Sequence, residues 1–289
     1  MTDAHCHPWD LLERLPDTEA ERRLSGTAAA ASSWSLSQFE YHEDLARKAR
    51  EEGAPPLFCC FSLHPQLAAY ENPLACEKPS ADAEKPDDFS LSAGLELLQS
   101  LGARGRLAAV GEAGFDLYDE KYRAGEKIQD EIFACHLETA LRHSLPLVLH
   151  VRRAMHKVFP FTKELKKLPA VVFHSWPGTM AEGQALLEKG INVFFSFGAA
   201  VLNNHKQAMS CAALFPADRI LLETDAPYQP LRGKDYSSWG DLDAICSCIA
   251  ALRKEAGSSG TDARELEEIT TANFFRVFRC QAPTSSRSG

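Results

Sequence analysis

Short apolar runs alternate with helical patterns along almost the whole chain of 289 residues. The runs are continuously apolar, which is typical of strands buried on both faces of a parallel sheet. We expect eight strands. The first ends at His5 and His7, and the others span residues 25–31, 57–61, 106–110, 146–150, 170–174, 191–195 and 219–225. Strands that alternate with helices over this length predict an α/β fold, the eight-stranded (β/α)8 barrel of the TIM type.

An open, doubly wound sheet is the alternative architecture for such an alternating chain. The sequence has no glycine-rich phosphate loop and no repeat period that would favour it. We therefore expect a single barrel domain over residues 1–280. Prolines and charges at residues 66–90 indicate a surface insertion, and the Ser-rich residues 281–289 indicate a disordered tail.

Helical periodicity and capping residues predict the connecting helices. Ser35 or Ser37 can cap a helix that runs to Glu52 and is closed by Gly53. After the fifth strand, a helix is expected to continue to about Lys167. Further helices are expected at residues 17–24, 92–101, 128–143, 180–189, 203–214, 242–255 and 262–278.

Composition limits the classes of function. The chain has 40 Asp and Glu against 31 Lys and Arg, a net charge of −9, which speaks against binding nucleic acid by diffuse attraction. No apolar run reaches the length of a membrane span, and no signal peptide is visible, so no membrane association is expected. Nine scattered cysteines, an odd number, favour reduced thiols and a cytoplasmic location.

Two histidines stand at the end of the first expected strand. In an extended segment side chains alternate with period two, so His5 and His7 point to one side and Cys6 points to the other, into packing. The rise along the strand separates the two imidazoles by about 7 Å, which suits two ligands that converge on one metal ion.

Other potential ligands follow the later strands. Glu112 follows the fourth strand, and His150, His174 and Asp225 end the fifth, sixth and eighth. The carboxyl ends of barrel strands share the face on which active sites are built, so these side chains should meet the two amino-terminal histidines. Four imidazoles and two carboxylates suit Zn, Mn, Fe or Co, and Mg less well. Six ligands exceed what one catalytic ion needs, so we expect two divalent ions.

Six short motifs occur in order between Asp3 and about Phe278. They are Asp3-Ala4-His5-Cys6-His7, His64-Pro65, Gly111-Glu112-Ala113-Gly114-Phe115-Asp116, His150-Val151-Arg152-Arg153-Ala154, His174-Ser175-Trp176-Pro177-Gly178 and Glu223-Thr224-Asp225-Ala226-Pro227. Together they resemble the TatD family of metal-dependent deoxyribonucleases, in the amidohydrolase superfamily. The resemblance implies that His5, His7 and Asp225 hold one ion, that His150 and His174 hold the other, and that Glu112 bridges them.

The activity that the resemblance implies is a two-metal phosphodiesterase, a deoxyribonuclease of the 3′–5′ exonuclease type. A metal-bound hydroxide would attack phosphorus, with Asp225 and Glu112 as the catalytic carboxylates. Hydrolysis of a small ester, lactone or amide by the same site is the alternative, and a non-catalytic metal-binding scaffold is disfavoured because all ligands are present. DNA or another phosphodiester is the expected partner, with no obligate protein partner.

Two residues are expected to contact the substrate. Arg152 should share the face of His150, where its guanidinium fork fits two phosphate oxygens; an ion pair with Glu112 or Asp225 is the alternative. His64 ends the third strand and could contact a phosphate or leaving group, or fix a loop.

The chain also departs from the family's usual motifs. Arg153 stands where the family usually has an acid, and Trp176-Pro177 replaces the usual Phe-Thr. Tyr118 and Trp176 could stack on a base or simply pack in their loops. These departures bear on the size and polarity of the substrate.

Overall fold

A computed structural model of the chain describes residues 1–71 and 90–279. Eight strands form one sheet in chain order, and each strand pairs in parallel with the next. They are β1 (Thr2–Cys6), β2 (Ala28–Ser33), β3 (Leu57–Phe61), β4 (Ala109–Asp116), β5 (Leu147–Arg152), β6 (Val171–Phe173), β7 (Val193–Phe197) and β8 (Ile220–Leu222).

The sheet curls into a barrel that backbone hydrogen bonds close between the first and last strands. The Asp225 N–H donates to the His5 carbonyl at 2.9 Å, and the His7 N–H donates to the Ala226 carbonyl at 2.7 Å. The Asp3 carboxylate adds two bonds across the same junction, from the hydroxyl and the N–H of Thr224. The predicted (β/α)8 barrel is therefore confirmed, and the open doubly wound sheet is excluded.

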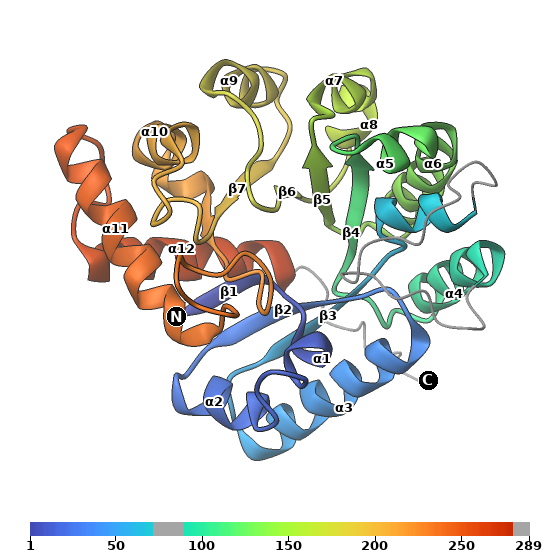
Figure 1. Cartoon of the computed structure of the whole chain (residues 1–289), viewed down its shortest axis with the longest axis horizontal. Helices are drawn as coiled ribbons and strands as arrows, with labels where there is room; N and C mark the ends of the chain where they lie inside the picture. Colours follow the sequence, from blue (N-terminus) through green and yellow to red (C-terminus); the bar gives the residue numbers. More distant parts are fainter. Residues whose placement is uncertain (72–89, 280–289) are drawn as a thin grey trace, which may run out of the picture.

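The helices surround the strands (Figure 1). They are α1 (Pro8–Leu11), α2 (Thr18–Leu24), α3 (Leu36–Glu52), α4 (Leu91–Ala103), α5 (Glu120–Ala124), α6 (Glu126–His143), α7 (Met155–Val158), α8 (Thr162–Leu165), α9 (Met180–Glu188), α10 (Lys206–Leu214), α11 (Leu242–Glu255) and α12 (Ala263–Phe278). Ser35 caps α3, and Gly53 closes it in a left-handed conformation, as predicted. No helix in the described part of the chain combines the length and apolarity needed to cross a membrane.

Two expected elements were wrong. The helix expected to reach Lys167 is broken into α7, the 3-10 helix η2 (Phe159–Phe161) and α8, since Pro160 lacks an N–H and cannot continue an α-helical ladder. The surface insertion was expected to begin at residue 66, but η1 (Pro65–Tyr70) packs Leu67 and Ala68 into a buried cluster with Ile132 of α6. Residues 72–89 and the expected tail at 281–289 lie outside the described residues.

Small apolar side chains fill the barrel interior below the site. Ala4, Ala28, Ala30 and Ala109 lie in one buried cluster with larger residues of β5 to β8. Helix α12 adds Phe274, Val277 and Phe278 to this cluster, and its Asn273 amide donates to the carbonyl of Ile220, the first residue of β8. Helix α12 therefore closes the amino-terminal end of the barrel.

Each of two strands carries one extra residue. In β1, Asp3 lies opposite Ala29 and Cys6 opposite Ala31, so three steps along β1 match two along β2. In β4, Val110 and Ala113 lie opposite residues of β5 that are only two positions apart. Such bulges change which side chains face inward. His5 and Glu112 stand within these two bulges, and both point into the barrel mouth.

Candidate metal centre

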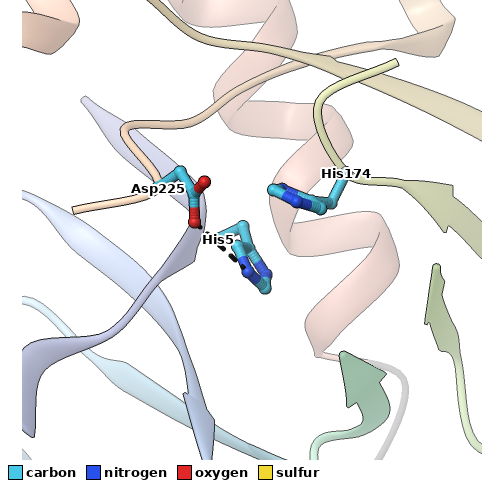
Figure 2. Close-up of side chains that lie close together, drawn as sticks. All are labelled: His5, His174 and Asp225. Carbon is cyan, nitrogen blue, oxygen red and sulfur yellow. Dashed lines mark ion pairs between the residues drawn. The ribbon is translucent and has the colours of Figure 1, made fainter. Parts of the chain in front are cut away.

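The six residues predicted to bind metal meet at the carboxyl ends of the strands. They surround the base of a cavity of about 480 Å³, and His7, Glu112, His150, His174 and Asp225 contribute to its wall. His5 is almost fully buried beneath them. Figure 2 shows His5, His174 and Asp225 converging from β1, from the end of β6 and from the loop after β8.

Glu112 lies at the centre of the group, and its two oxygens face different histidines. Oε1 is 2.5 Å from Nδ1 of His150 and 3.2 Å from Nε2 of His174. Oε2 is 3.2 Å from Nε2 of His5 and 3.6 Å from Nε2 of His7. One carboxylate therefore links two pairs of imidazoles, which is the arrangement that a bridging ligand requires.

Asp225 completes one side of the group. Its Oδ1 is 3.4 Å from Nε2 of His7 and 3.7 Å from Nε2 of His5. Its Oδ2 accepts a 2.7 Å hydrogen bond from the Gln229 amide, whose oxygen accepts a hydrogen bond from the Ser175 hydroxyl. Asp225, Gln229 and Ser175 all have positive φ values, which are uncommon for residues with a Cβ and concentrate at functional sites.

The donor set and its spacing fit metal ions. Three groups each have ligand atoms within 4.8 Å of one another: His5 with His174 and Asp225, His5 with His7 and Glu112, and His64 with Glu112 and His150. Imidazole nitrogens with carboxylate oxygens are the ligands of Zn, Mn, Fe and Co sites.

The electrostatics of the group also fit bound cations. Burial alone would raise the pKa of Glu112, but the surrounding imidazoles, His64 and His174 foremost, hold it well below its usual range. Burial lowers the pKa of His5, whereas Glu223 and Glu112 overcome burial and raise the pKa of His174. An ionised carboxylate among closely packed imidazoles is stable either with protons or with metal ions on the nitrogens.

In three of the imidazoles, the ring nitrogen that does not face Glu112 contacts a second carboxylate. The pairs are His7 Nδ1 with Asp10 at 3.7 Å, His150 Nε2 with Asp116 at 3.3 Å, and His174 Nδ1 with Glu223 at 3.2 Å. Such carboxylates fix the orientation of a ligating ring. The sequence analysis gave none of these three carboxylates a role at the site. Asp116 is the last residue of the Gly-Glu-Ala-Gly-Phe-Asp motif, and its place in that motif was the sequence signal that could have indicated a role at the site.

The two residues expected to contact substrate, and Trp176, which could have stacked on a base, lie in different surroundings. Arg152 lines the cavity, and within the described residues no ion pair joins it to Glu112 or Asp225. His64 also lines the cavity, and its Nε2 lies 3.4 Å from Oε1 of Glu112. Trp176 is only 4% exposed and packs on Phe195, so it cannot stack on a base.

Comparisons with known proteins show the family to which the chain belongs. The family model described as TatD related DNase matches residues 2–279. The chain therefore belongs to this family, and it is a metal-dependent hydrolase.

Individual relatives cover most of the barrel. The "Uncharacterized metal-dependent hydrolase YcfH" of Escherichia coli K12 is 31% identical over 193 residues, 65% of this chain and 69% of that protein. The "3′-5′ ssDNA/RNA exonuclease TatD" of Pectobacterium carotovorum is 31% identical over 188 residues, 64% of this chain and 70% of that protein. The crystal structure of the TatD homologue YjjV from E. coli K12 matches with a TM-score of 0.75 at 23% identity, covering 97% of this chain and 98% of that one. This last likeness concerns the fold.

Proposed function

We propose that the protein is a phosphodiesterase that uses two divalent ions to remove nucleotides from the 3′ end of DNA. The observation that carries the proposal is the position of Glu112, whose two oxygens face two separate pairs of imidazoles. A relative named as a 3′-5′ ssDNA/RNA exonuclease supports the substrate class.

The ligands divide naturally between two ions. His5, His7 and Asp225 would hold one, His150 and His174 the other, and Glu112 would bridge them. Nitrogen-rich ligands favour Zn, Mn, Fe or Co over Mg. Bound ions of this kind lower the pKa of a coordinated water toward neutrality and neutralise charge on a phosphate.

The chain's own residues supply the remaining steps. Asp225, whose Oδ2 is held by the Gln229 amide, accepts the proton of the attacking water. Arg152, at the cavity wall, binds the phosphate oxygens through its guanidinium fork. Glu112, in addition to bridging, holds the histidines of both ions in a fixed relation.

The size of the cavity favours the end of a strand as the substrate. A volume of about 480 Å³ is in the range of sites for small molecules, and it would accommodate about one nucleotide. A duplex, whose major groove alone is about 12 Å wide, is too wide to enter such a space. A single-stranded 3′ end is therefore the expected substrate.

The test is to incubate protein loaded with Zn or Mn with single-stranded DNA, duplex DNA and a panel of esters, lactones and amides. Release of mononucleotides from the 3′ end of single strands supports the proposal. The Asp225→Asn variant should bind DNA but release no nucleotide, and circular dichroism should show an unchanged fold. Rapid cleavage of a lactone, ester or amide without any cleavage of DNA would replace the proposal with the alternative hydrolase.

A further inference from the structure

Two consecutive arginines stand at the mouth of the cavity. Arg152 is the last residue of β5 and lines the cavity, and Arg153 follows it directly. Both side chains are exposed. Among the described residues, Arg152 is also the one permanently cationic residue of the cavity wall, which otherwise carries the acids Asp10, Glu112 and Asp225.

Both guanidinium groups pack on one aromatic ring. The Cζ of Arg152 lies 3.7 Å from the centroid of the Tyr118 ring, and the Cζ of Arg153 lies 4.4 Å from it. Tyr118 is 37% exposed, and its N–H donates to the buried Asp116 carboxylate at 2.9 Å. The Leu117 N–H, one residue earlier, donates to the Arg152 carbonyl. The ring and the two cations are thus held together at the junction of β4 and β5.

Neither guanidinium has a carboxylate partner within residues 1–71 and 90–279, although Asp119 and Glu120 follow Tyr118 directly. Several other surface arginines are paired, for example Arg47 with Glu51 at 2.7 Å and Arg264 with Glu268 at 3.3 Å. Two like charges over one ring repel each other. A bound anion relieves that repulsion, and a guanidinium that is stacked on an aromatic ring keeps its N–H groups free to bind one.

The backbone of Arg153 adds a second observation. Its φ is +55°, a left-handed conformation that a residue with a Cβ adopts rarely and at a cost. Such conformations persist where the surrounding structure holds them, and they concentrate at ligand-binding positions. Here the conformation brings the Arg153 guanidinium back over the ring that Arg152 already covers.

We propose that Arg153, stacked on Tyr118 beside Arg152, forms an anion subsite for a second phosphate group of the substrate, next to the phosphate that Arg152 binds at the reaction centre. The inference rests on the proposed function and names its substrate class: nucleic acid strands with at least two phosphates, in preference to molecules with a single phosphodiester. It also gives a function to the arginine that replaces the acid usual in this family. In a chain with a net charge of −9, this pair supplies local attraction for a polyanion.

The experiment measures binding to metal-free protein in a chelator, where no cleavage occurs. Calorimetry compares a thymidine dinucleotide, which has one phosphate, with the trinucleotide, which has two. The wild-type protein should bind the trinucleotide about tenfold more tightly, since one charge-assisted contact is worth about that factor. Arg153→Ala should remove most of this preference and reduce the slope of log affinity against log salt by about 0.7 for single strands. Arg153→Lys should retain most of it.

The matched control is Arg104→Ala, another exposed arginine, which lies beside Phe278 at the opposite end of the barrel. It should leave the preference and the salt slope unchanged. If Arg153→Ala also leaves both at wild-type values, the subsite does not exist. If the trinucleotide preference depends on Arg153 but loaded protein cleaves no DNA, the subsite stands and the proposed nuclease activity fails.

Discussion

At the scale of single residues, one carboxylate ties the two halves of the candidate metal centre together. Glu112 reaches histidines of β1, β5 and the end of β6 from a single position in β4. A carboxylate that bridges two ions would hold them close enough to act on the same phosphate, and its negative charge would offset the repulsion between the two cations.

We expect Glu112→Gln to lower the metal content from about two ions per chain to one or none, because the amide removes the shared negative charge. Turnover should fall by more than the about 10- to 100-fold that is typical for a partner outside the ligand set. Elemental analysis after dialysis and initial rates on a single-stranded substrate check both parts. Two tightly bound ions in this variant would contradict the bridging role.

Gln229 is the second residue for which the geometry makes a prediction. Its amide N–H donates to Oδ2 of Asp225 at 2.7 Å, so it fixes the carboxylate without reaching the imidazoles. Gln229→Leu should lower kcat by about 10- to 100-fold and change KM little, since the residue positions Asp225 and not the substrate. Gln229→Asn, which is too short to reach Asp225, is the control for loss of polarity. A change in KM alone would show that Gln229 binds substrate.

At the scale of elements, the residue patterns predicted the order and type of the strands better than their ends. Strand β4 was expected over residues 106–110, yet it spans Ala109–Asp116. Gly114 is required there by contact and not by a turn: a Cβ on it would lie 2.1 Å from the His150 carbonyl. The sequence carries no sign of this close approach between β4 and β5.

The bulges in β1 and β4 escaped prediction for a related reason. Period-two alternation placed His5 and His7 on one side, and the structure agrees. It does not say where a strand takes an extra residue, because the register depends on the neighbouring strand. The stacking of Arg152 on Tyr118 depends in the same way on how the ends of β4 and β5 meet, and the hydrogen bond from Gln229 to Asp225 depends on the conformation of the loop after β8.

A buried histidine couples helix α6 to the end of β3 and predicts how stability depends on pH. His136 is fully buried, and its Nε2 accepts a hydrogen bond from the Leu63 N–H at 3.0 Å. Burial lowers the pKa of His136 from 6.5 to about 3. Its folded pKa lies below its unfolded one, so its contribution to stability is complete above pH 6.5 and is lost as the pH falls toward 3.

The variant His136→Gln, whose amide oxygen can still accept the Leu63 N–H, should therefore flatten the fall of Tm between pH 6.5 and 4. The difference in this pH dependence between the variant and the wild-type protein should correspond to one proton fewer taken up on unfolding of the variant. Thermal melts of metal-free protein check this without interference from the metal centre. His156→Gln, at an exposed position, is the control and should retain the wild-type slope.

At the scale of the whole molecule, the ligands come from β1, β4, β5 and the segments after β6 and β8, so bound ions would cross-link nearly the full chain. Ions that bind only the folded state stabilise it by about 2.7 kcal/mol at a concentration 100 times the Kd. Zn or Mn should therefore raise Tm by several degrees, at about 2–4 °C per kcal/mol for a chain of this size. The rise should shrink as the pH falls, because protons compete for the imidazoles. Equal Tm values with and without metal at neutral pH would contradict a site of this kind.

The closure of one barrel end by α12 has a consequence for how a polymer would be processed. Among the described residues, Phe274, Val277 and Phe278 fill the barrel beneath the candidate metal centre, so a strand that enters at the carboxyl face would have to leave by the same opening. If the proposed exonuclease activity holds, a released nucleotide would lie between the metal centre and the remaining strand. The shortened strand would then have to leave the cavity before the nucleotide, which predicts a distributive enzyme and not a processive one.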